Sequence, residues 1–244
     1  MSRKLDPPIF IISTKAYLWG EKALKLARIA DRIAREYDVC FIMIPQLVDL
    51  RMIAESVDIP VYAPNMDPIR PGRGHGHDLP EALKEAGAAG VMINHSERPK
   101  TLSEIDGCIK RAREIGLRII VCCDSPSAAE ALASLEPDAI LPEPPRLIGT
   151  KKPVSVEMKQ FVIDSVKAVK SRSRKILLLV GAGISRGSDV AEAIRLGADG
   201  AGASRAICES SNPEELLREI AEAMRKAWDS RREEEWRGGG PGGI

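Results

Sequence analysis

The sequence predicts an α/β fold, a single domain in which eight parallel strands close into a (β/α)8 barrel. Two observations favour it. Short apolar runs of strand length recur eight times along the chain, and segments with helical spacing of apolar residues lie between them. Strands that alternate with helices form parallel sheets with helical crossovers. A repeat of about thirty residues per unit fits a closed barrel in a chain of 244 residues.

Each predicted strand is a short run of β-branched or other apolar residues. In chain order the runs are 9–13 (IFIIS), 39–44 (VCFIMI), 59–63 (IPVYA), 90–93 (GVMI), 118–123 (RIIVCC), 138–142 (DAILP), 175–180 (KILLLV) and 199–203 (DGAGA). Between them, apolar residues recur at intervals of three and four, which predicts helices. These helices cover residues 22–36, 79–86, 101–115, 127–135, 155–170, 188–196 and 213–228.

An open, doubly wound sheet would show the same alternation of strands and helices. The first predicted strand is not followed by the Gly-x-Gly-x-x-Gly pattern of dinucleotide-binding folds, and eight repeats favour closure. We therefore expect a barrel domain over residues 1–228 and a tail over 229–244. The tail reads DSRREEEWRGGGPGGI, a charge run followed by glycines, which predicts a frayed helix end and a disordered segment.

Composition excludes several classes of function. With 36 basic and 35 acidic residues, the chain lacks the positive electrostatic field of a nucleic-acid-binding protein. A local site must therefore hold any anionic ligand. No apolar stretch approaches the length of a membrane span, and the first residues do not resemble a signal peptide. The five cysteines include no CxxC pair, and three lie in predicted strands. A reduced, cytoplasmic protein with buried thiols is the expected setting.

In a barrel of this kind, chemistry belongs at the carboxyl ends of the strands. That rule selects the polar or glycine-rich segments that directly follow apolar runs. They are Ser13 to Lys15, Asn94 to Glu97, Cys122 to Asp124, Glu143 with the two prolines after it, and Gly181 to Gly183.

Three of these residues are candidates for catalysis. Lys15 could present an ammonium at the barrel mouth, although a lone lysine there is more often simply solvated. His95 could begin a short helical turn whose dipole favours the neutral imidazole, or it could be a structural histidine. Glu143 emerges from a buried strand into a rigid turn. That position is poorly explained if Glu143 is an ordinary surface charge. Partial burial would raise the pKa of the Glu143 carboxyl toward that of a useful base.

Glycines mark a candidate phosphate site. Gly149 lies in the loop after Glu143, and Gly181 and Gly183 follow the seventh strand. Glycines let backbone N–H groups approach an anion closely, and the loops after strands seven and eight of such barrels recurrently bind phosphate. Because glycine also serves ordinary turns, position in the barrel gives this signal its weight.

Several of these residues lie in motifs that the chain shares with a known protein family. Over about residues 7–225 it resembles archaeal triosephosphate isomerases. The most specific shared motifs are Asn-His-Ser-Glu at 94–97 and Glu-Pro-Pro-x-Leu-Ile-Gly-Thr at 143–150. Further matches are the segments 7–9, 15–17, 45–55, 58–61 and 181–185.

The resemblance implies an isomerase of glycolysis and gluconeogenesis that interconverts dihydroxyacetone phosphate and D-glyceraldehyde 3-phosphate. In that family a glutamate is the base and a neutral histidine polarises the carbonyl group of the substrate. Those roles fall on Glu143 and His95, and Lys15 would stabilise the enediolate. The resemblance further implies that Asn94 and Glu97 support the site, that a homodimer or homotetramer forms, and that no metal or organic cofactor is needed. The remaining substrate-binding or phosphate-binding positions implied are Ser13, Ile148, Gly149, Gly183, Ser204 and Arg205.

Four positions depart from the family pattern. Ser13 replaces an asparagine, His75 stands for a threonine of the third loop, Lys151 replaces a glycine of the lid, and Arg205 replaces a glycine or serine of the phosphate loop. The Arg205 guanidinium would either crowd the pocket or pair with phosphate. These departures leave two alternatives open: a relative acting on another phosphorylated sugar, and a non-catalytic phosphate-binding descendant.

Overall fold

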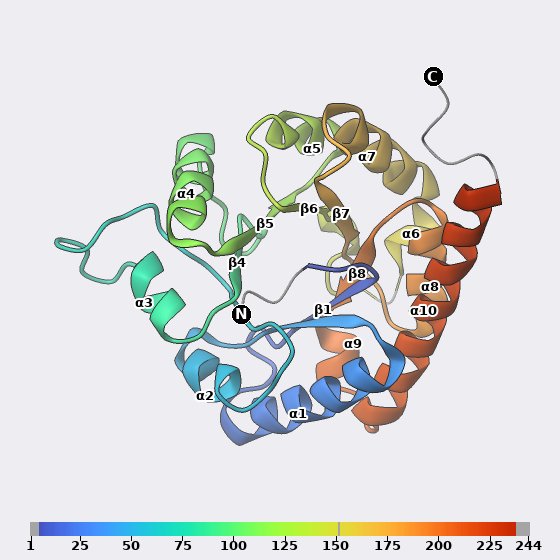
Figure 1. The fold of residues 1–244 in the computed structure, drawn as a ribbon, viewed down its shortest axis with the longest axis horizontal. Helices are drawn as coiled ribbons and strands as arrows, with labels where there is room; N and C mark the ends of the chain where they lie inside the picture. Colours follow the sequence, from blue (N-terminus) through green and yellow to red (C-terminus); the bar gives the residue numbers. More distant parts are fainter. Residues whose placement is uncertain (1–4, 151, 238–244) are drawn as a thin grey trace.

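The computed structural model describes residues 5–150 and 152–237, and these form the predicted (β/α)8 barrel (Figure 1). Eight parallel strands pair in the order β2-β1-β8-β7-β6-β5-β4-β3. A parallel bridge between Met43 and Val61 joins the two ends of this order and closes the ring. The strands are β1 (Ile9–Ser13), β2 (Cys40–Ile44), β3 (Tyr62–Ala63), β4 (Gly90–Ile93), β5 (Arg118–Cys123), β6 (Ala139–Pro142), β7 (Leu177–Val180) and β8 (Gly200–Ala203).

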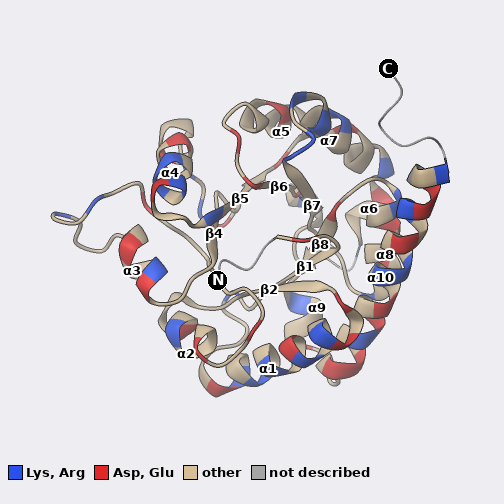
Figure 2. Ribbon diagram, viewed as in Figure 1, with Lys and Arg blue, Asp and Glu red and all other residues tan. Residues whose placement is uncertain are grey.

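Helices surround the ring of strands and carry most of the charged residues, whereas the strands are mainly uncharged (Figure 2). The α-helices are α1 (Gly20–Tyr37), α2 (Leu50–Ala54), α3 (Pro80–Glu85), α4 (Leu102–Ile115), α5 (Pro126–Ala133), α6 (Val154–Glu157), α7 (Lys159–Arg172), α8 (Gly187–Arg195), α9 (Arg205–Cys208) and α10 (Pro213–Arg237). Two short 3₁₀ helices, η1 (Leu47–Asp49) and η2 (Pro145–Leu147), follow β2 and β6. Among the described helices, none is both long and apolar enough to cross a membrane.

The structure differs from the predicted helices in three places. The helix expected over 155–170 is two helices, because Met158 has φ −141° and ψ 53° and interrupts the helical geometry. The short helices α2 and α9 were not predicted, since four or five residues are too few to show a periodicity. The last helix continues to Arg237, so residues 229–237 of the expected tail extend α10, and residues 238–244 lie outside the described part of the chain.

Local sequence signals explain where helices begin and end. At the start of α4, the Thr101 hydroxyl accepts a hydrogen bond from the Glu104 N–H, and the Glu104 carboxylate accepts one from the Thr101 N–H. This reciprocal capping satisfies two N–H groups that the helix itself cannot. The same helix ends at Gly116, whose φ of 71° is a conformation that favours glycine.

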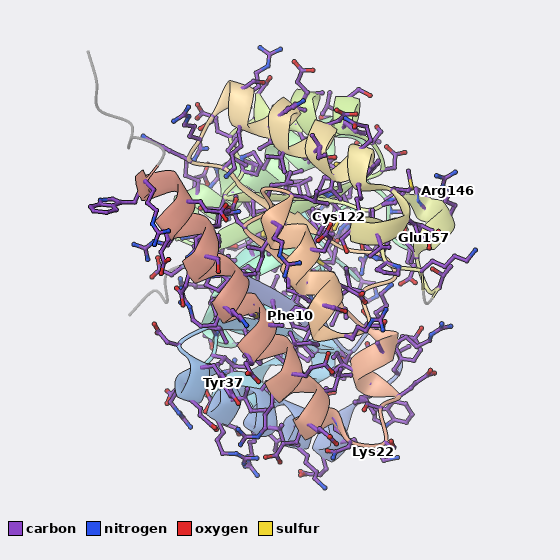
Figure 3. All side chains as sticks on the ribbon, turned by 90° about the vertical axis from the view of Figure 1, so that its right-hand side faces the viewer. Phe10, Lys22, Tyr37, Cys122, Arg146 and Glu157 are labelled. Atoms are coloured by element: carbon purple, nitrogen blue, oxygen red, sulfur yellow. The ribbon has the colours of Figure 1, made fainter. Side chains whose placement is uncertain are left out.

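Strand residues alternate between two apolar cores. Phe10 and Ile12 face outward and pack beneath the helices, whereas Ile9 and Ile11 face the interior of the ring. The interior core also contains Tyr62, Met92, Ile120, Leu141 and Leu179. Figure 3 shows Phe10 and Cys122 within the molecule, and Lys22, Arg146 and Glu157 at its edge. Because side chains fill the ring, the barrel interior is a packed core and not a pore.

The final turns of α10 pack against the segment that joins α8 to β8. The Arg231 guanidinium lies over the Trp228 ring, 4.1 Å from its centre. It also donates hydrogen bonds to the carbonyl oxygens of Ile194 and Ala198, at 3.3 and 2.7 Å. Ile194 lies in the last turn of α8, where carbonyl groups lack partners within the helix. Arg231 therefore ties the end of α10 to the end of α8 and to the residues that lead into β8.

Candidate active site

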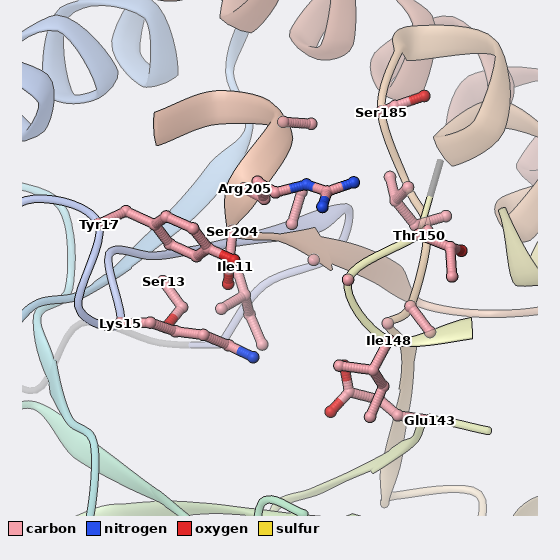
Figure 4. A pocket seen from close by; sticks show the side chains of 18 of the residues that line it. Ile11, Ser13, Lys15, Tyr17, Glu143, Ile148, Thr150, Ser185, Ser204 and Arg205 are labelled. Carbon is pink, nitrogen blue, oxygen red and sulfur yellow. The ribbon is translucent and has the colours of Figure 1, made fainter. Parts of the chain in front are cut away.

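A cavity of about 480 Å³ opens at the carboxyl ends of the strands (Figure 4). Most residues proposed from the sequence line it, although they come from five different strands or the loops that follow them. Those that line it are Ser13, Lys15, His95, Glu143, Ile148, Gly149, Gly183, Ser204 and Arg205. Asn94 and Glu97 do not line the cavity; Glu97 contacts His95 and Lys15, which do, and Asn94 directly precedes His95 in the chain. Of the residues that depart from the family pattern, His75 is exposed in the loop after β3, and Lys151 lies outside the described residues.

Side chains along a strand alternate between its two faces, and this alternation continues from the interior core into the cavity. On β6, Ala139 and Leu141 face the interior, and Glu143 is the next position of that series. On β1, Ile11 belongs to the interior core and also lines the cavity, and Ser13 lines the cavity two positions further on. The same two-residue period that packs the core therefore directs polar side chains into the cavity once each strand ends.

Glu143 is held as a buried carboxyl group. Its N–H continues the sheet by donating to the Cys123 carbonyl at 2.8 Å, and its side chain is 14% exposed. Burial raises the pKa of the Glu143 carboxyl to about 7; the charge of Lys15 lowers this pKa and the charge of Glu97 raises it. A carboxylate with a pKa of about 7 is a much stronger base than an exposed one, yet it is still largely ionised just above neutral pH.

His95 faces Glu143 as a neutral hydrogen-bond donor. The Glu97 N–H donates to His95 Nδ1 at 3.1 Å, so that nitrogen is an acceptor and the ring proton belongs on Nε2. Nε2 lies 3.4 Å from Glu143 Oε2, on the cavity side. Burial lowers the pKa of His95 and the charge of Lys15 lowers it further, while Glu97 opposes both. The imidazole is therefore uncharged at neutral pH and presents an N–H to the cavity.

The turn that carries His95 is fixed by Asn94. Asn94 has φ 60°, which turns the chain out of the strand geometry of β4. Its side-chain amide donates to the Cys122 carbonyl at 2.8 Å and accepts from the Lys100 N–H at 2.9 Å. These bonds link the ends of β4 and β5, so Asn94 acts on the site by holding the turn before His95.

Lys15 projects into the cavity from a strained loop. Its φ of 42° is unusual for a residue with a side chain, and its carbonyl accepts a hydrogen bond from the Gln46 amide. The Lys15 ammonium lies 3.1 Å from a carboxylate oxygen of Glu97, and in Figure 4 it points into the cavity from the wall opposite Glu143. No function was predicted for Gln46, although its place directly after β2 is the signal that selected the other site residues.

Small residues form one end of the cavity. Gly149 and Gly183 have φ near 70°, and a side chain at Gly183 would collide with the backbone of Lys152. Close approach of these loops therefore requires glycine, and it leaves backbone N–H groups available to an anion. Gly202 and Ala203 at the end of β8 also line this end and were missed. The sequence feature that indicates them is the Gly-Ala-Gly-Ala run of the last strand, because bulky residues are usual in a strand.

The fold and these groups define a class of protein. A largely buried carboxyl group, a neutral imidazole N–H opposite it, a lysine ammonium and a glycine-rich cavity end meet at the carboxyl end of a (β/α)8 barrel. This combination is typical of isomerases that move a proton between neighbouring carbons of a phosphorylated sugar, because it pairs a base with a donor to the carbonyl oxygen.

Comparisons with known proteins identify the family. The family model "Triosephosphate isomerase" matches residues 8–224. The chain is 42% identical over 214 residues to the triosephosphate isomerase of Methanocaldococcus jannaschii, an overlap that covers 87% of this chain and 98% of that protein. It is 38% identical over 230 residues to that of Sulfurisphaera tokodaii, covering 93% of this chain and 100% of the relative. The chain belongs to the triosephosphate isomerase family and is an isomerase.

Proposed function

We propose that this enzyme interconverts dihydroxyacetone phosphate and D-glyceraldehyde 3-phosphate by proton transfer through an enediolate. The observation that carries the proposal is the pairing of the buried Glu143 carboxyl with the Nε2–H of a neutral His95, 3.4 Å away. The names of the archaeal relatives, at about 40% identity over most of the chain, point to the same reaction.

Each group has a distinct role in the proposed reaction. Glu143 removes a proton from the carbon next to the carbonyl and returns it to the neighbouring carbon. His95 donates the hydrogen bond of its Nε2–H to the carbonyl oxygen, which becomes the enediolate oxygen. Lys15 stabilises the negative charge that develops there, and because its position is preorganised by the loop, no reorganisation is needed during the reaction.

The phosphate of the substrate would bind at the glycine-rich end of the cavity. Backbone N–H groups of Ile148, Gly149, Gly183 and Ser204 are the proposed donors, and Ser13 is a proposed polar contact near Lys15. Closure of the loop after Glu143 over the substrate would exclude water, which protects the enediolate from side reactions.

A turnover assay tests the proposed reaction. Purified protein is mixed with D-glyceraldehyde 3-phosphate, and formation of dihydroxyacetone phosphate is followed by a coupled assay; efficient turnover is expected. Aldose phosphates of four and five carbons are the controls and are expected to react far more slowly. Absence of turnover with the three-carbon substrate, or faster turnover of a longer one, would contradict the proposal.

We also propose that the chain forms a homodimer or homotetramer and works in the cytoplasm. Trp19 and Val48, which follow β1 and β2, are 65% and 89% exposed in the single chain, as expected for a surface that another subunit covers. The described cysteines are unpaired thiols, which suits a reducing compartment. Light scattering coupled to size-exclusion chromatography measures the subunit number; a monomeric mass would contradict the assembly.

Replacing Gly181 with Ala is expected to lower kcat by about a hundredfold while the protein stays folded. A β-carbon at Gly181 would collide with the Glu143 carboxylate, and Gly181 does not have a positive φ that would itself disfavour alanine. Displacement of a catalytic group by about 1 Å is enough for a loss of this size. Steady-state kinetics and thermal unfolding are measured together. Unchanged kcat would mean that the base does not act from this position.

Replacing Glu97 with Gln is expected to shift the pH dependence of kcat/KM toward acid. The Glu97 carboxylate raises the pKa of Glu143 and pairs with Lys15, so its removal lowers the pKa of the base. The variant should therefore retain activity to lower pH than the wild type, whose kcat/KM is expected to fall below pH of about 7. A shift toward alkaline pH would contradict this electrostatic account.

A further inference from the structure

Arg205 is the first residue of α9 and follows β8 after a single residue. It lines the cavity together with Gly183, Ser185 and Ser204. In Figure 4 its side chain extends across the upper part of the cavity toward Thr150 and Ser185, on the glycine-rich side and away from the wall that carries Glu143. The guanidinium therefore reaches the end of the cavity where the proposed phosphate donors gather.

The charge of Arg205 is weakly compensated. Its Nε lies 3.9 Å from a carboxylate oxygen of Glu209, a distance too long for a hydrogen bond, and its side chain is 37% exposed. Lys15, by contrast, is engaged with Glu97 at 3.1 Å on the other side of the cavity. Among the cavity-lining residues of the described chain, these two are the lysines and arginines present. The glycine-rich end of the cavity therefore has a cation, the Arg205 guanidinium, available to a ligand.

A guanidinium suits the ligand that this end is expected to hold. Its planar fork of N–H groups matches two oxygens of a phosphate and binds them with charge-assisted hydrogen bonds. Backbone N–H groups alone carry only partial charges and discriminate less between charge states of an anion. Neighbouring Arg186 does not serve this purpose, since it is paired with Asp189 and does not line the cavity.

We propose that the Arg205 guanidinium binds the phosphate dianion of the substrate directly and makes this isomerase selective for the phosphorylated over the unphosphorylated sugar. The proposal rests on the function proposed above, because it assigns one more substrate contact to the same cavity. It also resolves the alternative posed by the sequence: the side chain adds a positive contact to the cavity and does not close it.

Arg205→Gln tests the proposal because it keeps the length and polarity of the side chain and removes the charge. The KM for D-glyceraldehyde 3-phosphate and the inhibition constant for inorganic phosphate are both expected to rise about ten- to hundredfold. The reaction of unphosphorylated D-glyceraldehyde, followed by NMR in D₂O, is expected to fall by a far smaller factor. Arg205→Lys should recover part of the phosphate affinity, since charge returns without the fork.

Arg186→Gln is the matched control, because it removes a neighbouring arginine that does not line the cavity, and its phosphate affinity should equal that of the wild type. Equal losses for D-glyceraldehyde 3-phosphate and D-glyceraldehyde in Arg205→Gln, or an unchanged inhibition constant, would overturn the proposal. Calorimetric titration with inorganic phosphate measures the same contact without turnover. Loss of phosphate binding in the variant would therefore support the role of Arg205 even if the wild type did not isomerise the triose phosphate.

Discussion

Replacing Glu143 with Gln is expected to lower kcat by about three to four orders of magnitude, with a much smaller change in KM. The amide has nearly the shape of the carboxylate but cannot accept the proton, and a positioned general base contributes a factor of this size. The substrate would still find His95, Lys15 and the glycine-rich end unchanged. Single-turnover and steady-state kinetics with D-glyceraldehyde 3-phosphate measure the effect. A variant that retains a tenth of wild-type kcat would exclude Glu143 as the base.

The same variant is expected to be more stable than the wild type at alkaline pH. The folded protein raises the pKa of Glu143 from its ordinary value of 4.5 to about 7, so it holds this proton more tightly than the unfolded chain does. The resulting stabilisation is present below pH of about 4.5 and is lost as pH rises through about 7, where a buried charge forms. Glutamine never ionises and avoids this loss. Thermal unfolding should show a gain at pH 8.5 that shrinks at pH 5; a gain independent of pH would contradict this explanation.

Replacing Lys15 with Met is expected to lower kcat/KM by about three orders of magnitude. Methionine keeps most of the length of the side chain and removes the charge that faces the developing enediolate, and the loss of one preorganised electrostatic contact has effects of this size. Because Lys15 also lowers the pKa of Glu143, the acid limb of any residual activity should move to higher pH. Lys22→Met, at an exposed position of α1, is the matched control. Similar losses in the two variants would show that the effect is not specific to the cavity.

The sequence predicted most of the fold because the barrel repeats a strong local pattern. The predicted runs 9–13, 90–93 and 118–123 coincide with β1, β4 and β5, since each is a short, mainly apolar segment that a polar residue directly follows. The strand expected over 59–63 is reduced to Tyr62–Ala63. Pro60 lacks an N–H and cannot donate to the ladder, although its carbonyl accepts from Met43.

The candidate site was predictable to the extent that it depends on position after a strand. That rule selects Lys15, His95 and Glu143 from the sequence alone. The rule does not reveal which groups meet in space. The hydrogen bond from Gln46 to the Lys15 carbonyl joins residues 31 positions apart, and the fixing of the His95 turn by Cys122 spans the ends of two strands. Such contacts depend on the register of the closed ring, which local periodicity does not specify.

The attachment of Arg231 also bears on how this enzyme could be handled. Its contacts lie at the residues that enter β8, and the cavity opens where the strands end, so α10 ends on the face opposite to substrate entry. A tag or fusion partner placed after α10 would leave from that opposite face. Immobilisation on a solid support through such an attachment should therefore orient the cavity toward solution and leave the loop after Glu143 free to move.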